Sequence, residues 1–141
     1  MAFLRAKSEL NRAAADSLYK SGQHPSAVHC AYYSCVQLMK HIMIHQIGKS
    51  EQDIDNEYRQ IGVDGKRKFG GIHEYLINVL YGVLISKDVD ATTFNSNVLQ
   101  LKKLRGKSDY SDTFQVDSSI SSTSIRLSDI VIKELKKNFK V

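Results

Sequence analysis

Two short segments of the chain carry the side chains that could do chemistry. Residues 104–110 read Leu-Arg-Gly-Lys-Ser-Asp-Tyr, so a guanidinium (Arg105), a carboxylate (Asp109) and a phenol (Tyr110) fall within two turns of a helix. Much earlier, residues 31–34 read Ala-Tyr-Tyr-Ser inside a strongly apolar stretch. A guanidinium can hold a phosphate group and stabilise charge on it, but it is a poor proton carrier. Arg105 is therefore suited to holding a phosphate, and not to moving protons.

Arg105 and Asp109 also have a purely structural interpretation. They stand at i,i+4, where opposite charges form an intrahelical ion pair worth about 0.3–0.5 kcal/mol when exposed. Tyr110 would then pack its ring and keep its hydroxyl in water. A positive neighbour stabilises the ionised form of a carboxylate, which makes Asp109 a weak candidate for a general base. The residues alone are consistent with both interpretations, a functional site and a structural ion pair.

The paired tyrosines are expected to point in different directions, because adjacent residues on a helix do not share a face. Tyr32 falls on the apolar face and is predicted to lie in the core. Tyr33 is predicted to lie in a cleft or an interface, with its hydroxyl in need of a partner.

Basic residues gather in three clusters, 66–68, 102–107 and 133–140, in a chain of formal net charge +5. This distribution permits an acidic partner such as RNA, held through its phosphates. Solvated helix ends are the alternative, because the helix dipole favours lysines in last turns. If RNA binds, the expected contacts are Lys66, Arg67, Lys68, Lys102, Lys103 and Lys107.

Three other patterns are weaker. His41 and His45 stand at i,i+4, but the neighbouring turn offers no third and fourth metal ligand. Residues 66–71 read Lys-Arg-Lys-Phe-Gly-Gly, which lacks the ending of a P-loop and predicts a basic connector. Arg67 and His73 match an Arg-x5-His spacing, which we interpret as a chance match. We therefore expect no metal site and no cofactor.

Long helices must position these residues, because apolar side chains recur at helical spacing over most of the chain. In the first of them the recurring residues are Phe3, Leu10, Ala14 and Leu18. Residues 50–61 fit either a short surface helix or a loop, and 63–71 and 111–119 fit connectors. The predicted helices span about residues 3–20, 25–47, 72–86 and 119–139. A further helix, capped by Asp90, precedes the last of these and carries Phe94, Val98, Leu101 and Leu104.

The predicted fold class is all-α, an antiparallel up-and-down bundle of four to five main helices in a single domain over residues 1–141. A single proline in the chain fits long helices better than a many-turned β protein. The expected core comprises Tyr32, Leu38, Met39, Leu76, Leu80, Leu101, Leu104 and Leu127.

The compartment is expected to be cytoplasmic. The N-terminal residues have no apolar stretch typical of a secretory signal, and the longest apolar run, residues 75–85, is too short to span a membrane. Cys30 and Cys35 fall on different faces of one predicted helix, so we expect two reduced thiols.

The order and spacing of several motifs resemble the HEPN superfamily, over about residues 10–137. The resemblance implies a small helical bundle, and a homodimer whose shared cleft contains the Arg105–Tyr110 region. It also implies links to RNA cleavage, toxin–antitoxin systems and nucleotidyltransferase partners. His73 is a loose match to a histidine that opens a later helix in many members. The other matching residues are Leu18, Gly22, Ala27, Ala31, Tyr32, Tyr33, Arg105, Ser108, Asp109 and Tyr110.

One departure from that pattern decides the expected function. Ribonuclease members carry a histidine four to six residues after the arginine, and Arg105 has none within that reach. Histidine is suited to both proton transfers of metal-independent RNA cleavage near neutral pH. We therefore expect an accessory module that binds a nucleotide, RNA or protein partner. The alternatives are a metal-independent endoribonuclease that uses Arg105 with Asp109 or Tyr110, and a purely structural homodimer.

Overall fold

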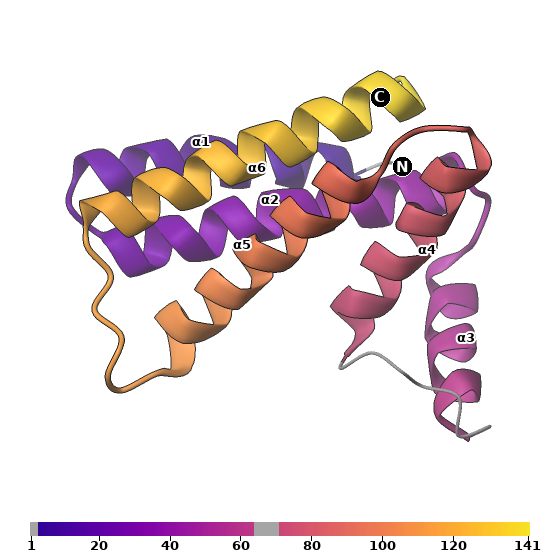
Figure 1. Cartoon of the computed structure of the whole chain (residues 1–141), viewed down its shortest axis with the longest axis horizontal. Coiled ribbons are helices and arrows are strands. Elements are labelled where there is room, and N and C mark those ends of the chain that lie inside the picture. Colours follow the sequence, from indigo (N-terminus) through magenta and orange to yellow (C-terminus); the bar gives the residue numbers. More distant parts are fainter. Residues whose placement is uncertain (1–2, 64–70) are drawn as a thin grey trace.

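The computed structural model describes residues 3–63 and 71–141, and every regular element in them is an α-helix (Figure 1). This confirms the predicted all-α class. No helix in the described ranges is long and apolar enough to cross a membrane. The helices are α1 (Phe3–Lys20), α2 (His24–His45), α3 (Glu51–Val63), α4 (Ile72–Ser86), α5 (Thr92–Tyr110) and α6 (Ser118–Phe139).

Most predicted helix bounds agree with the structure to within two residues, and the differences have local causes. Residues 51–63 form a helix, α3, so the expected short helix, and not a loop, follows α2. The expected cap Asp90 accepts a hydrogen bond from the backbone N–H of Thr92 (3.1 Å), although Ala91 occupies the N-cap position itself. At α6 the cap is Asp117, which the sequence interpretation missed; it accepts from the N–H of Ile120 (3.0 Å).

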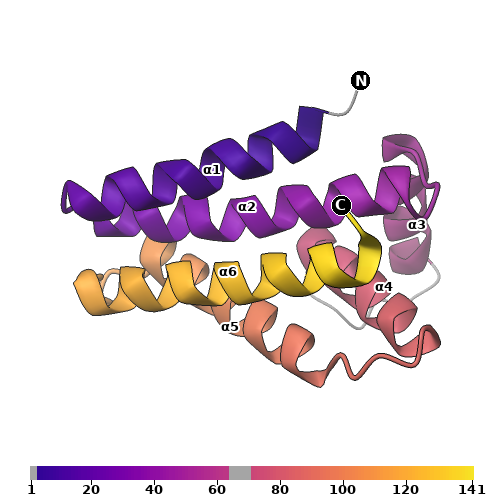
Figure 2. The ribbon, with the colours of Figure 1, turned by 90° about the horizontal axis from the view of Figure 1, so that it is seen from above.

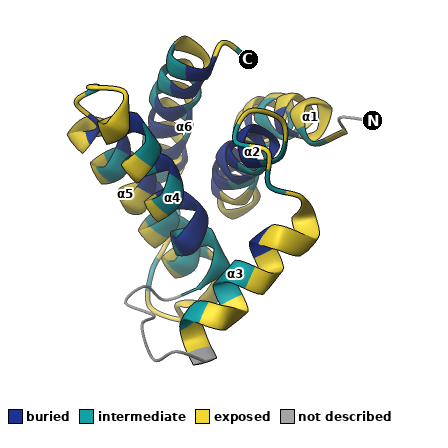
Figure 3. Cartoon of the chain, turned by 90° about the vertical axis from the view of Figure 1, so that its right-hand side faces the viewer, coloured by how far each residue is buried: buried dark blue, intermediate teal, exposed yellow. Residues whose placement is uncertain are grey.

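Helix α2 is the centre of the molecule. It contacts α1, α4, α5 and α6, and more than half of its residues are buried. Figure 2 shows α1 and α6 on either side of α2, and Figure 3 shows the buried faces of α2, α4, α5 and α6 turned toward one another. The Tyr32–Tyr33 pair therefore lies on the element that every other long helix packs against.

The core contains nearly all of the residues expected there. Seven of the eight are at most 2% exposed: Tyr32, Leu38, Met39, Leu76, Leu80, Leu101 and Leu127. Leu104 is half-buried and packs against the same cluster. Leu101 and Leu104 thus determine which face of α5 is turned to the core. Arg105 follows Leu101 by one helical turn on the same side of α5.

The predicted apolar stripe of α1 is only partly buried, because Ala14 and Leu18 are half-buried whereas Phe3 and Leu10 are exposed. Phe3 is 59% and Leu10 is 71% exposed, whereas Ser8 and Ala15 are the residues buried against the bundle. The physical reason is close packing, because small side chains let α1 approach α2. The Ser8 hydroxyl donates to the backbone carbonyl of Ser34 across this contact (2.6 Å). The outer side of α1 therefore carries apolar residues that nothing in the described structure covers.

Stability is expected to fall as the pH drops below neutral, because of His41. This residue is 7% exposed, and its Nδ1 makes no hydrogen bond within the described residues. Burial lowers the pKa of His41, assisted by His45 and Arg5, and burial also lowers the pKa of His73. The unfolded chain takes up these protons near the ordinary pKa of about 6.5, before the folded protein does. Stability is therefore complete above that pH and declines as the pH falls through it.

The measurement is the free energy of unfolding in urea at about pH 7.5 and about pH 5.5. His41→Leu should reduce the difference between the two values, leaving the contribution of His73. His45→Gln, at the exposed neighbour, should retain most of it. An unchanged difference in His41→Leu would contradict this origin of the pH dependence.

Candidate functional site

Arg105 lies where α5 crosses the first half of α2, among three aromatic rings. Its guanidinium carbon is 5.0 Å from the ring centre of Tyr32, and 5.8 Å from the ring centres of both Tyr33 and Tyr110. Helix α5 continues through residue 110, so the whole 104–110 segment is helical. Cations at these distances from aromatic faces are stabilised by the negative face of the ring.

The expected ion pair between Arg105 and Asp109 is present, with 3.6 Å between Nη1 and Oδ2. The setting differs from the exposed surface pair that was considered, because the side chain of Arg105 is only 13% exposed and that of Asp109 is 20% exposed. The Nε of Arg105 is buried and makes no hydrogen bond within the described residues. Arg105 is therefore a largely buried cation with incomplete pairing, and such a group is rare unless a role or a ligand accounts for it.

His29 is a site residue that the sequence interpretation missed. Its Nδ1 lies 3.0 Å from Oδ2 of Asp109, and its ring centre lies 4.6 Å from that of Tyr33. The His29 side chain is 48% exposed, so this pair faces solvent. The available signal was the spacing of His29 and Tyr33, one helical turn apart. A histidine therefore does stand beside the Arg105–Asp109 pair, although it comes from another helix.

His73 lies on the other side of the tyrosines. Its Nδ1 is 2.9 Å from the hydroxyl of Tyr32, and its ring is 5.6 Å from that of Tyr33. Burial, with the positive charges of Arg105, Lys102 and Lys40, lowers the pKa of His73, and burial raises the pKa of Tyr32. His73 is therefore neutral and Tyr32 is protonated at neutral pH, which fits a hydrogen bond donated by the phenol to Nδ1.

The two tyrosines differ in burial. Tyr32 is fully buried, as predicted, and Tyr33 is half-buried beside His29 and His73. Both rings nevertheless approach Arg105. Their rings meet edge to face at 5.3 Å, and the long arginine side chain reaches the boundary between them. Tyr110, by contrast, is 80% exposed.

A cavity of about 320 Å³ opens beside His29 and Asp109, with Pro25, Ser26 and Cys30 as its other lining residues. Burial raises the pKa of the Cys30 thiol, so this thiol is protonated at neutral pH and is a poor nucleophile. Besides Ser26 and the Cys30 thiol, the polar groups that line the cavity are an imidazole and a carboxylate that already contact each other. The cavity has room for a small group to approach this pair from solvent.

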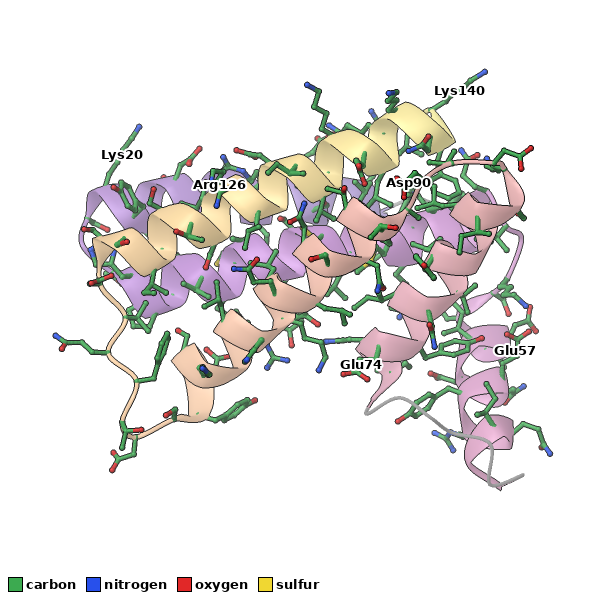
Figure 4. All side chains as sticks on the ribbon, viewed as in Figure 1. Lys20, Glu57, Glu74, Asp90, Arg126 and Lys140 are labelled. Atoms are coloured by element: carbon green, nitrogen blue, oxygen red, sulfur yellow. The ribbon has the colours of Figure 1, made fainter. Side chains whose placement is uncertain are left out.

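The basic residues of α5 divide into two kinds. Lys102 pairs with Glu74 of α4 (3.2 Å from Nζ to Oε1), and Figure 4 labels Glu74 near the start of that helix. Lys103 and Lys107 are exposed, and the Nζ of Lys107 lies 5.5 Å from the ring centre of Phe114. The other expected contacts, Lys66, Arg67 and Lys68, lie outside the described residues.

The His41–His45 pair is not joined by further ligands. The two rings lie 4.5 Å apart, with His41 buried and His45 exposed. Over residues 3–63 and 71–141 no group of three histidine, cysteine, aspartate or glutamate side chains is placed to hold a metal ion. The two cysteines are free thiols, Cys35 buried and Cys30 partly buried.

Comparison with known proteins finds no family model, no curated protein and no solved structure that matches this chain.

Proposed function

We propose that the chain is a HEPN-like accessory module that binds the phosphate groups of RNA or of a nucleotide and does not cut them. The main observation is Arg105, a largely buried guanidinium among three aromatic rings. Its ion-pair partner among the described residues, Asp109, also contacts His29. A guanidinium offers several donors in a rigid plane, and Asp109 engages one edge of it. A phosphate oxygen would contact the small part of the Arg105 side chain that is open to solvent, and not the Nε, which is buried.

The surroundings of Arg105 support a nucleic acid or nucleotide as the source of that phosphate. Lys103 and Lys107 are exposed on the same helix, and they can neutralise further phosphates. Tyr110 presents an almost free ring on which a base can stack. Lys103, Lys107 and Tyr110 follow one another at spacings of four and three residues, so they share one side of α5. Rows of cations and aromatic rings are typical of surfaces that bind single strands without base preference.

Binding is favoured over cleavage because one of the two histidines of the site, His73, is already engaged. His73 is neutral, and its Nδ1 is already engaged by Tyr32. The antiparallel HEPN-like order of the helices belongs to the same proposal, as does a homodimer around Arg105–Tyr110. So does a place in a toxin–antitoxin or nucleotidyltransferase-linked system. These rest on the resemblance.

The test is binding of a fluorescent single-stranded RNA in EDTA over a series of salt concentrations, with the RNA examined on a gel afterwards. We expect affinity to fall steeply with salt, little preference among sequences, and intact RNA. Binding that does not respond to salt would remove the phosphate argument. Absence of any binding would favour the structural homodimer.

A metal-independent endoribonuclease is the second candidate, and the His29–Asp109 contact is what favours it. In that reaction a base takes the proton of a 2′-hydroxyl, whose oxygen attacks phosphorus. The bond to the 5′-oxygen breaks, and an acid protonates that oxygen. His29 could serve as the base, and Arg105 could stabilise the charged phosphate. RNA cut in EDTA by the wild type, and left intact by both Arg105→Ala and Asp109→Asn, would establish this function in place of binding alone.

A further inference from the structure

The outer side of α1 carries an apolar stripe. Phe3, Ala6, Leu10, Ala13 and Ser17 are all exposed, and they are separated alternately by three and four residues. This spacing is that of the seam of a coiled coil, where one helix packs along another. The buried side of α1, at Ser8 and Ala15, already faces the bundle. Helix α1 therefore has a second packing face on its outer side, and Figure 3 shows that side uncovered.

Two large side chains dominate this outer face. Leu10 is 71% and Phe3 is 59% exposed, more than every other large hydrophobic residue of the described chain except Tyr110. One exposed leucine on a surface is ordinary. Phe3 and Leu10 lie about two helical turns apart, with Ala6 between them and Ala13 after them. Together they form a continuous strip against which another helix can pack.

We propose that this face binds a second copy of the chain, with the two α1 helices antiparallel about a two-fold axis that passes beside Ser8. In this register Phe3 lies opposite the partner's Ala13, and Leu10 lies opposite the partner's Ala6. Each large side chain then meets a small one, which is the alternation that close packing of two helices requires. The stripe is thus complementary to the same stripe running in the opposite direction on a second copy, as a two-fold contact requires.

Charge complementarity supports a second copy as the occupant. Arg5 and Glu9 flank the stripe on one edge and are half or more exposed, at 51% and 60% of their side chains. Within one chain they form a loose pair, 3.5 Å from Nε to Oε1. In the antiparallel register Arg5 lies within about one turn of the partner's Glu9, so two Arg5–Glu9 pairs can form between the chains and offset the approach of the two Glu9 carboxylates.

The remaining charges on this edge are already engaged, which leaves Arg5 and Glu9 available. Arg12 forms a two-bonded fork with Asp129 of α6 (Nε–Oδ1 2.6 Å, Nη2–Oδ2 2.8 Å), and its Nη1 lies 2.8 Å from Asp16. Between α1 and α6 a cavity of about 370 Å³ borders Arg5 and Glu9 and gives their side chains room to move.

The contact is independent of the Arg105 site, because α1 packs on the opposite side of α2 from α4 (Figures 2 and 3). A pair of helices of this length buries less surface than a standard stable interface, so the association should be concentration-dependent, in the micromolar range.

The experiment is the molar mass by light scattering and sedimentation, over protein concentrations from about 10 to about 500 µM. Leu10→Glu should halve the mass of the wild-type assembly at the upper end of the range, or weaken the association at least tenfold. Ile85→Glu, at an exposed isoleucine of α4, is the matched control and should leave the mass unchanged. An unchanged mass for Leu10→Glu would overturn the proposal, as would a wild type that is monomeric throughout.

A charge exchange tests the register. Arg5→Glu alone should weaken the association, because it sets like charges against each other between the chains. The double variant R5E/E9R should restore it, since the opposite charges are present again with their positions exchanged. Failure of the double variant to recover would exclude this antiparallel register. RNA binding by the Leu10→Glu variant should equal that of the wild type at low protein concentration, so a failure of this proposal is distinguishable from a failure of the proposed function.

Discussion

Replacing Arg105 with alanine is expected to weaken the binding of single-stranded RNA by about ten- to a hundredfold. The estimate follows from one charge-assisted hydrogen-bonded contact to phosphate, worth about 1.5–3 kcal/mol, at 1.4 kcal/mol for each factor of ten. The effect should exceed that of one surface charge because Arg105 is held between Tyr32 and Tyr33, so little side-chain freedom is lost on binding. The measurement is a fluorescence titration at a fixed salt concentration.

Arg126→Ala is the matched control, because it removes the same charge from an exposed position. Figure 4 labels Arg126 on α6. We expect it to change the affinity less than about threefold, as for one screened charge. Arg105→Lys keeps the charge but loses the planar fork, so its affinity should lie between those of wild type and alanine variant. Equal losses in Arg105→Ala and Arg126→Ala would mean that net charge, and not this site, binds the RNA.

A folding check must accompany the Arg105 variants. The arginine side chain is largely buried, and its removal leaves Asp109 with His29 as its partner. A melting temperature measured for each variant separates lost binding from lost structure. Arg105→Ala protein that melts within a few degrees of wild type and still binds weakly would support a direct contact.

The helices and the core could be predicted from the sequence because both follow from local periodicity. An apolar residue every three to four positions fixes both the presence of a helix and the face that it buries, as on α2 and α5. The predicted core residues were accordingly found buried, with Leu104 half-buried. The ion pair between Arg105 and Asp109 was predictable for the same reason, since it depends only on helical spacing.

The face of α1 could not be assigned in this way, because α1 has apolar residues on two sides. Periodicity favours the side with the larger residues, Phe3 and Leu10. In the structure the side with Ser8 and Ala15 is buried instead, because small side chains allow α1 to approach α2 closely. This preference depends on the shape of the opposing helix, which a pattern within one segment does not contain.

The rest of the candidate site depends on contacts between distant segments. His29 and Asp109 are 80 residues apart in the sequence, and Tyr32 and His73 are 41 apart. Their meeting is set by how α2, α4 and α5 cross, and no single segment determines that. A search for histidine near Arg105 along the chain therefore found none, whereas the fold brings His29 to its ion-pair partner.

Replacing Leu101 with alanine is expected to lower the free energy of unfolding by about 2–5 kcal/mol. Leu101 is fully buried in the main core cluster, and truncating such a residue removes both its transfer free energy and its packing contacts. A loss of this size is a large share of the roughly 5–15 kcal/mol that holds a domain folded. The measurement is urea unfolding followed by circular dichroism, with the midpoint and slope fitted separately.

Leu99→Ala is the control on the same helix, because Leu99 is 38% exposed and the change in helix propensity is identical. It should cost well under about 1 kcal/mol, as expected for a surface substitution. The comparison also bears on the site, since Leu101 precedes Arg105 by one turn on the same side of α5. If Leu101 anchors that side, its alanine variant should bind RNA normally while folded and lose binding at the temperature where it unfolds. An equal loss in the free energy of unfolding for Leu99→Ala and Leu101→Ala would mean that α5 does not turn this face to α2. The aromatic rings placed around Arg105 would then not be its neighbours.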